Sequence, residues 1–171
     1  MQQLFAAKTG LFIVPLASLA ALALAFISQY VFELQPCVLC IYQRWPFAIA
    51  AALCLVALTP SARPSAPWLL LLSALVLAVN AGIAVYHVGV EQYWWIGTED
   101  CVGKTGTAQT LAELRAQIMA TPITRCDEVA FSLFGISMAG YNIAFSTGLA
   151  WYAGLASKIC FGVGFRIKHR Q

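Results

Sequence analysis

Two cysteines and an arginine at fixed spacing are the residues of this 171-residue chain best suited to chemistry. Cys37 and Cys40 form a Cys-Val-Leu-Cys motif, and Arg44 follows four residues later. Two thiols at this spacing can be oxidised to a disulfide and reduced again, so they form a two-electron redox pair. A fixed positive charge beside them stabilises a thiolate or binds an electron-rich ligand.

Helical spacing would put these three side chains on one face. Pro36 suits the first position of a helix, so we expect Cys37 in the first turn, where the helix dipole favours a thiolate. A static disulfide and half of a zinc site are the alternatives. A static bridge would close a very short loop, and the chain has no second motif of this kind to complete four zinc ligands. We therefore favour redox chemistry and expect no metal.

The composition places these residues at a membrane. Hydrophobic residues make up 61% of the chain and charged residues only 10%, with a mean hydropathy of +0.78. Soluble domains carry about 25% charged residues. The net charge is +3 and no dense basic block is present, so nothing indicates a nucleic-acid partner.

Four apolar segments are long enough to span a bilayer, which takes about 20 residues of helix. They cover residues 11–30, 41–58, 68–88 and 131–156. Backbone groups must be paired in lipid, so we expect an all-α membrane protein. The fold is predicted to be a single domain, 1–171, built as a four-transmembrane-helix bundle. The first segment continues past any cleavage site, so we expect an uncleaved span rather than a signal peptide.

Charge asymmetry orients the bundle. An even number of spans puts both termini on one side, which carries six basic residues and no acidic one: Lys8, Arg63, Lys158, Arg166, Lys168 and Arg170. The other side has four basic residues and all seven acidic ones: Arg44, Lys104, Arg115, Arg125, Glu33, Glu91, Glu99, Asp100, Glu113, Asp127 and Glu128. Basic loops stay in the cytoplasm. Both termini and the 59–67 loop are therefore predicted to be cytoplasmic, with the Cys37 turn and the 91–130 loop outside.

The outer loop carries a second cysteine pair, Cys101 and Cys126. Disulfides persist outside the cytoplasm, so the four outer cysteines are candidates for two pairs. A purely structural Cys101–Cys126 bridge would contribute roughly 3–4 kcal/mol. The enclosed segment instead resembles a short amphipathic helix on the membrane surface, because a capping-box pattern begins at Thr110. We expect such a loop to be mobile and its disulfide to be open to exchange, with a structural bridge as the alternative.

The remaining cysteines have no such context. Cys54 falls inside the second span and Cys160 just beyond the fourth. We expect both to be free thiols that pack as small apolar side chains.

The decapeptide Gln-Pro-Cys-Val-Leu-Cys-Ile-Tyr-Gln-Arg at residues 35–44 resembles the signature of the disulfide bond formation protein B (DsbB) family of bacterial inner membranes. The four spans, the second cysteine pair and the surface helix between its members resemble that family too. The resemblance implies a thiol:quinone oxidoreductase. Such an enzyme reoxidises a DsbA-like thioredoxin-fold periplasmic protein and passes the electrons to ubiquinone or menaquinone.

The resemblance also implies roles for the four outer cysteines. Cys101 takes the position that forms the mixed disulfide with the partner, and Cys126 resolves it by attacking Cys37. Cys40 is then released as a thiolate that faces the quinone. A DsbA-type disulfide is among the strongest thiol oxidants, at about −120 mV, so only a strongly oxidising acceptor regenerates it.

Two further residues match the family pattern at the quinone. Arg44 matches an arginine that helps to bind quinone and stabilises the Cys40 thiolate, and His87 matches a histidine beside the quinone. The stretch 127–142 departs from the best-known members, which leaves the natural partner open.

Two other functions were weighed. A membrane thiol reductase that runs electrons outward would need cysteines reachable from the cytoplasm, and Cys54 and Cys160 do not form such a motif. A non-enzymatic scaffold with structural disulfides would tolerate loss of Cys37 or Cys40 with only a loss of stability.

Overall fold

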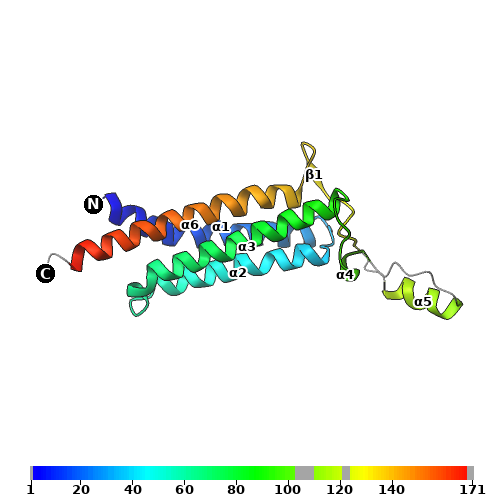
Figure 1. Cartoon of the computed structure of the whole chain (residues 1–171), viewed down its shortest axis with the longest axis horizontal. Helices are drawn as coiled ribbons and strands as arrows, with labels where there is room; N and C mark the ends of the chain where they lie inside the picture. Colours follow the sequence, from blue (N-terminus) through cyan, green and yellow to red (C-terminus); the bar gives the residue numbers. More distant parts are fainter. Residues whose placement is uncertain (1, 103–109, 121–123, 169–171) are drawn as a thin grey trace.

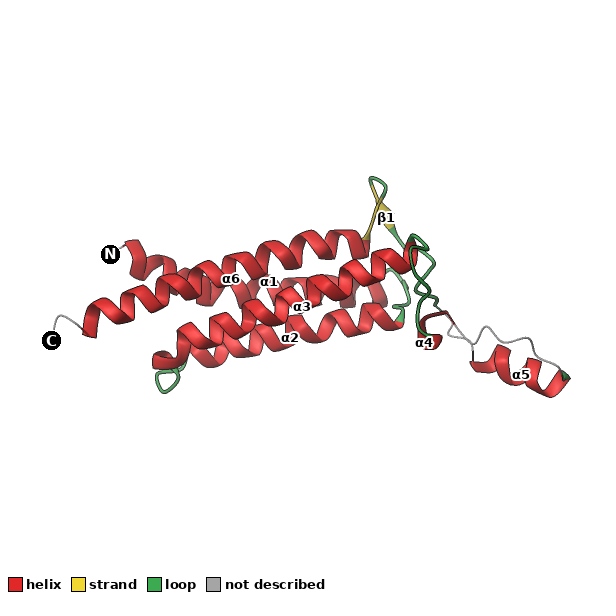
Figure 2. Ribbon diagram, viewed as in Figure 1, coloured by secondary structure: helices red, strands yellow, loops and turns green. Residues whose placement is uncertain are grey.

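Four long helices pack side by side in the computed structural model, which describes residues 2–102, 110–120 and 124–168 (Figure 1). They are α1 (Gln2–Tyr30), α2 (Val38–Ala57), α3 (Ala66–Glu91) and α6 (Met138–Lys168). α1 contacts α2 and α6, and α3 contacts the same two helices, so the four close into a ring. Figure 2 shows that helix dominates the described chain and that irregular structure gathers at the two ends of the long helices.

The short elements are η1 (Arg63–Ser65), α4 (Glu99–Val102), α5 (Leu111–Ala120), β1 (Ser132–Leu133) and β2 (Ile136–Ser137). The connection α2–η1–α3 lies at one end of the ring, and the other short elements lie at the opposite end (Figure 1). Of the charged residues used to orient the chain, Lys104 and Arg170 lie outside the described residues.

Three helical segments are long and apolar enough to cross a membrane: Thr9–Tyr30, Val38–Ala57 and Arg63–Glu91. The first three predicted spans are thus confirmed as helices of spanning character. α6 is not one of these segments, so the fourth span stays a prediction. It also begins at Met138 rather than at residue 131.

A small hairpin takes the place of the expected first turn of the last helix. β1 and β2 pair antiparallel, with Ser132 opposite Ser137 and Leu133 opposite Ile136. The two turn residues between them, Phe134 and Gly135, have φ angles of 50° and 78°. Positive φ at both positions is typical of the turns that join strands tightly. The hairpin is the one exception, among the described residues, to the expected all-α fold.

The ring encloses an apolar core and also exposes an apolar outer surface. Leu70 and Leu77 of α3 and Val14 of α1 are fully buried. At Gly10, an added Cβ atom would lie 2.5 Å from the Cβ of Ala156, so glycine there lets α1 approach α6 closely. The outer surface carries large exposed hydrophobic side chains, among them Phe12, Leu16, Trp68, Val79 and Trp151. An aqueous surface rarely shows so much contiguous apolar area, whereas lipid favours it.

The chain folds back on itself after α3. The Trp95 ring stacks on Tyr86 with centroids 5.8 Å apart and planes 9° apart, and its indole N–H donates to the Tyr86 carbonyl at 2.9 Å. Gly89 leaves room for this contact, because an added Cβ would meet the Trp95 ring at 1.9 Å.

The helix expected between Cys101 and Cys126 is present as α5, which lies apart from the ring (Figure 1). Its capping box is formed as predicted. The backbone N–H of Glu113 donates to the Thr110 hydroxyl at 3.2 Å, and the N–H of Thr110 donates to the Glu113 carboxylate at 3.1 Å. Leu111, Leu114 and Ile118 are exposed.

Candidate active site

Cys37 caps the N-terminus of α2 instead of lying inside its first turn. Its backbone is extended, with φ −73° and ψ 170°, and its sulfur accepts the backbone N–H of Cys40 at 3.3 Å. The helix therefore begins at Val38, two residues after the start expected at Pro36, and Cys37 precedes the first turn. The physical reason is that the sulfur satisfies a backbone donor that the first helical turn leaves open. The Cys37 thiol also donates to the sulfur of Cys40 at 2.9 Å.

Four of the cysteines, Cys37, Cys40, Cys101 and Cys126, meet at this helix end. Cys126 lies in side-chain contact with both Cys37 and Cys101, and its backbone N–H donates to the Cys101 carbonyl at 3.0 Å. Cys101 and Cys126 are fully buried, and Cys37 is 5% exposed. In the structure each of these cysteines is a free thiol. The sulfurs therefore stand in the order Cys101, Cys126, Cys37, Cys40.

The hydrogen bond at the end of this row has a defined direction. The Cys37 thiol donates to the Cys40 sulfur at 2.9 Å, and Cys126 lies next to Cys37 and Cys101. Cys40 is thus the final acceptor, in the first turn of α2, where the helix dipole favours negative charge.

This arrangement shifts the pKa values of the thiols that lie outside the spanning helices. The bond received from Cys126 lowers the pKa of Cys37, but the bond donated to Cys40 together with burial outweighs it and raises that pKa to about 12. Burial, then donation to Cys126, raises the pKa of Cys101 to about 11. Donation to Cys37, then burial, raises the pKa of Cys126. Three of the four thiols are therefore held in their protonated form.

His87 completes the site from α3. Its ring is 3% exposed, and Nε2 lies 3.5 Å from the Cys37 sulfur. The other ring nitrogen, Nδ1, accepts from the Gln43 side-chain amide at 3.1 Å. The structure thus places His87 beside the cysteine pair, and its expected place beside a quinone stays a prediction.

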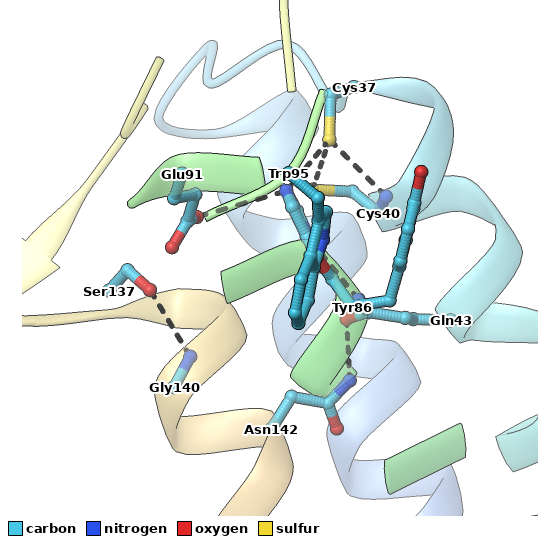
Figure 3. A network of polar contacts seen from close by, with 10 residues as sticks. Cys37, Cys40, Gln43, Tyr86, Glu91, Trp95, Ser137, Gly140 and Asn142 are labelled. Atoms are coloured by element: carbon cyan, nitrogen blue, oxygen red, sulfur yellow. Dashed lines mark hydrogen bonds and ion pairs between the residues drawn. The ribbon is translucent and has the colours of Figure 1, made fainter. Parts of the chain in front are cut away.

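A chain of buried hydrogen bonds fixes the orientation of Gln43. Its carbonyl oxygen accepts from the amide of Asn142 at 2.6 Å (Figure 3). The Asn142 carbonyl accepts from the Ser146 hydroxyl at 2.8 Å, and that hydroxyl accepts from the Asn80 amide at 2.9 Å. The network joins α2, α3 and α6 through the interior of the ring.

Glu91 was expected in the outer loop, and the structure corrects this. It is the last residue of α3, and its side chain is 5% exposed. One carboxyl oxygen lies 3.8 Å from His87 Nε2, and the other has no hydrogen-bond partner among the described residues. Sequence reasoning missed it because the apolar run was read as ending at residue 88. The available signal was its spacing of four from His87, which places both on one helix face.

A cavity of about 380 Å³ opens beside the thiols. Cys37, Cys40, His87 and Glu91 line it, together with apolar residues of α1 and α6 such as Leu24 and Phe145. A mainly apolar cavity with a few convergent polar groups is typical of a small-molecule site.

Arg44 lines the same cavity but does not bind Cys40. Its guanidinium donates to the Gln29 side chain at 2.6 Å and to the Ala25 carbonyl at 3.5 Å, and it lies 5.1 Å from the centre of the Phe26 ring. The structure therefore ties Arg44 to α1 and brings it to the cavity, not to the thiol.

Metal binding was also considered for the site. The sulfurs of Cys37 and Cys40 and a ring nitrogen of His87 lie within 4.8 Å of one another, a group able to offer three ligands. A structural zinc site takes four.

Comparison with known proteins identifies the family. The family model described as "Disulfide bond formation protein DsbB" matches residues 7–156. A Rickettsia prowazekii protein described as uncharacterized is 29% identical over 140 residues, covering 81% of this chain and 80% of its own length.

Two relatives are named "Disulfide bond formation protein B". The one from Xanthomonas axonopodis pv. citri is 30% identical over 146 residues, covering 81% of this chain and 83% of the relative. The one from Herminiimonas arsenicoxydans is 40% identical over 86 residues, covering 48% of this chain and 52% of the relative. No solved structure matches. The chain therefore belongs to the DsbB family of inner-membrane oxidoreductases that act in disulfide bond formation.

Proposed function

We propose that this protein reoxidises a DsbA-like thioredoxin-fold protein of the periplasm and passes the electrons to ubiquinone or menaquinone. The observation that supports this most directly is the row of four sulfurs, three of them in buried residues, which ends at the half-buried Cys40 beside the cavity. In this proposal all four long helices span the inner membrane, both termini are cytoplasmic, and the cysteines face the periplasm.

The first exchange takes place at the loop pair. A thiolate of the reduced partner attacks Cys101 in a Cys101–Cys126 disulfide, which forms a mixed disulfide and releases Cys126 as a thiolate. Cys126 then attacks Cys37 in a Cys37–Cys40 disulfide. A Cys126–Cys37 bond forms, and Cys40 leaves as a thiolate at the cavity. Each attack joins sulfurs that are neighbours in the row.

The remaining exchanges restore the protein. The second thiol of the partner attacks the partner's own sulfur in the mixed disulfide, so the partner leaves oxidised and Cys101 is freed. Cys101 attacks Cys126 and releases Cys37, which closes the loop disulfide again. The Cys37–Cys40 dithiol then gives up two electrons and two protons and returns to the disulfide.

The cavity suits a quinone as the acceptor. Its apolar walls from α1 and α6 match a hydrophobic ring and tail, and Arg44 and His87 offer polar contacts for ring oxygens. When bound, the quinone supplies a strongly oxidising acceptor for two electrons and two protons.

The test is quinone reduction by the purified full-length protein, supplied with a short-chain ubiquinone analogue and a reduced thioredoxin-fold partner. Cys40→Ser is expected to abolish reduction, because the last sulfur of the row is lost. Cys160→Ser is the matched control, since Cys160 is a half-buried thiol far from the row in sequence, and it is expected to retain the rate. Reduction that persists in Cys40→Ser would contradict the proposed electron path.

A further inference from the structure

The proposed thiol–disulfide exchanges give no role to Glu91, although its buried carboxyl group lies in the same site. It lines the cavity, its side chain is 5% exposed, and one of its oxygens has no hydrogen-bond partner among the described residues. An isolated carboxylate in such a place costs several kcal/mol, so a buried carboxyl needs either a cationic partner or a proton.

His87 is the nearest candidate cation, and the hydrogen-bond chain keeps it neutral. Asn142 donates to the Gln43 carbonyl, which turns the Gln43 NH₂ group toward His87 Nδ1. Because Nδ1 accepts this bond, the single ring proton of His87 resides on Nε2. A second ring proton on Nδ1 would face the amide hydrogens of Gln43.

The other charged groups at the cavity have partners elsewhere. Arg44 of α2 is bound to Gln29 of α1, and Arg125 forms a bidentate pair with Asp127 at 2.9 and 2.7 Å. Glu128, also at the cavity, lies 3.9 Å from Arg125 and is 74% exposed.

The remaining groups that face the Glu91 carboxyl supply no positive charge. They are the thiols of Cys37 and Cys40 and the hydroxyl of Ser137 on β2. Among the described residues, therefore, no cation pairs with Glu91, and the carboxyl is best accommodated with a proton.

We propose that Glu91 is the proton donor of the cavity: its neutral carboxyl delivers a proton to an oxygen of the acceptor bound beside Cys40. The inference rests on the proposed function. Oxidation of the Cys37–Cys40 dithiol releases two electrons and two protons, and reduction of a quinone consumes both. Glu91 gives one proton to the acceptor oxygen and is reprotonated by a proton that the thiols release.

His87 acts on this carboxyl as a positioning residue. Its Nε2–H lies between the Cys37 sulfur at 3.5 Å and the Glu91 oxygen at 3.8 Å. The second distance exceeds a hydrogen bond, so the ring does not withdraw the carboxyl from the cavity. It offers a donor to the carboxylate that remains after the proton has left.

Glu91→Gln tests the proposal, because glutamine keeps the size and hydrogen-bonding shape but has no proton to transfer. We expect the rate constant for quinone-analogue reduction to fall about 100-fold, the usual contribution of a general acid. The affinity for the analogue, measured by quenching of tryptophan fluorescence, should stay unchanged. Glu33→Gln is the matched control, an exposed carboxyl that does not line the cavity, and it should leave both quantities unchanged.

A second readout does not depend on turnover. The infrared spectrum of the protein without quinone should contain the carbonyl band of a buried protonated carboxylic acid, which Glu91→Gln removes and Glu33→Gln retains. If Glu91→Gln does not fold, Glu91→Asp serves instead and should keep the band with a reduced rate.

Two results would overturn the assignment: an infrared band that persists in Glu91→Gln, or a reduction rate in that variant within about twofold of the unmodified protein. Failure of the proposed function gives a different result, since the unmodified protein then reduces no quinone with any partner.

Discussion

The hydrogen bond from Cys37 to Cys40 predicts how the reduced protein reacts with alkylating reagents. Cys37 donates its S–H to Cys40 at 2.9 Å, and this bond with burial overrides the lowering effect of Cys126 and raises the pKa of Cys37 to about 12 from 9.0. The difference is three pKa units, so at pH 8 the thiolate fraction of Cys37 is about 1,000-fold lower than for an unperturbed thiol.

Cys40→Ala is the informative perturbation. It removes the acceptor and its negative charge, while the lowering contact from Cys126 remains. We expect the pKa of Cys37 to fall by at least about one unit, which raises its alkylation rate at pH 8 at least tenfold. Cys126→Ala removes the opposing contact, so it should slow the alkylation of Cys37.

The assay is alkylation of the fully reduced protein over a series of pH values, followed by mass spectrometry of the peptide that contains Cys37. The pH dependence distinguishes a change in the pKa of Cys37 from a change in its access to the reagent. A change in access multiplies the alkylation rate by the same factor at every pH. Cys54→Ala is the control, since Cys54 is bonded to Ser73 in the bundle core and is no part of the row. A Cys37 rate that levels off near pH 9 in the unmodified protein would refute the reasoning, as would equal profiles in the two row variants.

Two further predictions follow from the same structure. First, a raised thiol pKa means that the folded state holds its protons more tightly than the unfolded state. The stabilisation from Cys37 and Cys101 is therefore complete below about pH 9 and is lost as the pH rises toward 11–12. The thermal unfolding midpoint of the reduced protein should fall over this range, and a midpoint constant from pH 8 to 11 would contradict the prediction. Second, Gly89→Ala should push the Trp95 ring off Tyr86, because the added Cβ meets that ring at 1.9 Å. The tryptophan fluorescence should then shift toward that of a more exposed indole. Gly82→Ala is the control, because a Cβ added at Gly82 has no atom within 4 Å.

Local patterns in the sequence predicted the elements that depend on local physics. Long apolar runs predicted four spanning helices, three of which are confirmed, and the Thr110–Glu113 capping box predicted the start of α5. Both signals are contained within one stretch of chain. The hairpin at 132–137 was not predicted, because Phe134 adopts a φ of 50° that its residue type does not favour, and Gly135 alone is a weak turn signal.

The parts of the site that depend on tertiary contact could be predicted only in part. The four cysteines were identified from their motif and predicted topology and His87 from the family resemblance, and the structure brings them together. The link from Gln43 to Asn142 joins residues 99 positions apart, which no spacing rule reveals. A polar residue inside an apolar span, such as Asn80, was the available signal. The roles of all these residues in turnover stay predictions.

The stretch from Thr124 to Phe131 contributes both to the sulfur row and to the wall of the cavity. It carries Cys126 in the middle of the sulfur row, and five of its other members, Thr124, Arg125, Glu128, Ala130 and Phe131, line the cavity. Cys126 must move between Cys101 and Cys37 if both exchanges are to occur. Residues that line the cavity precede and follow Cys126 in the chain. In the proposed mechanism, each movement of Cys126 therefore also changes the shape of the cavity, because both belong to the same short stretch of chain.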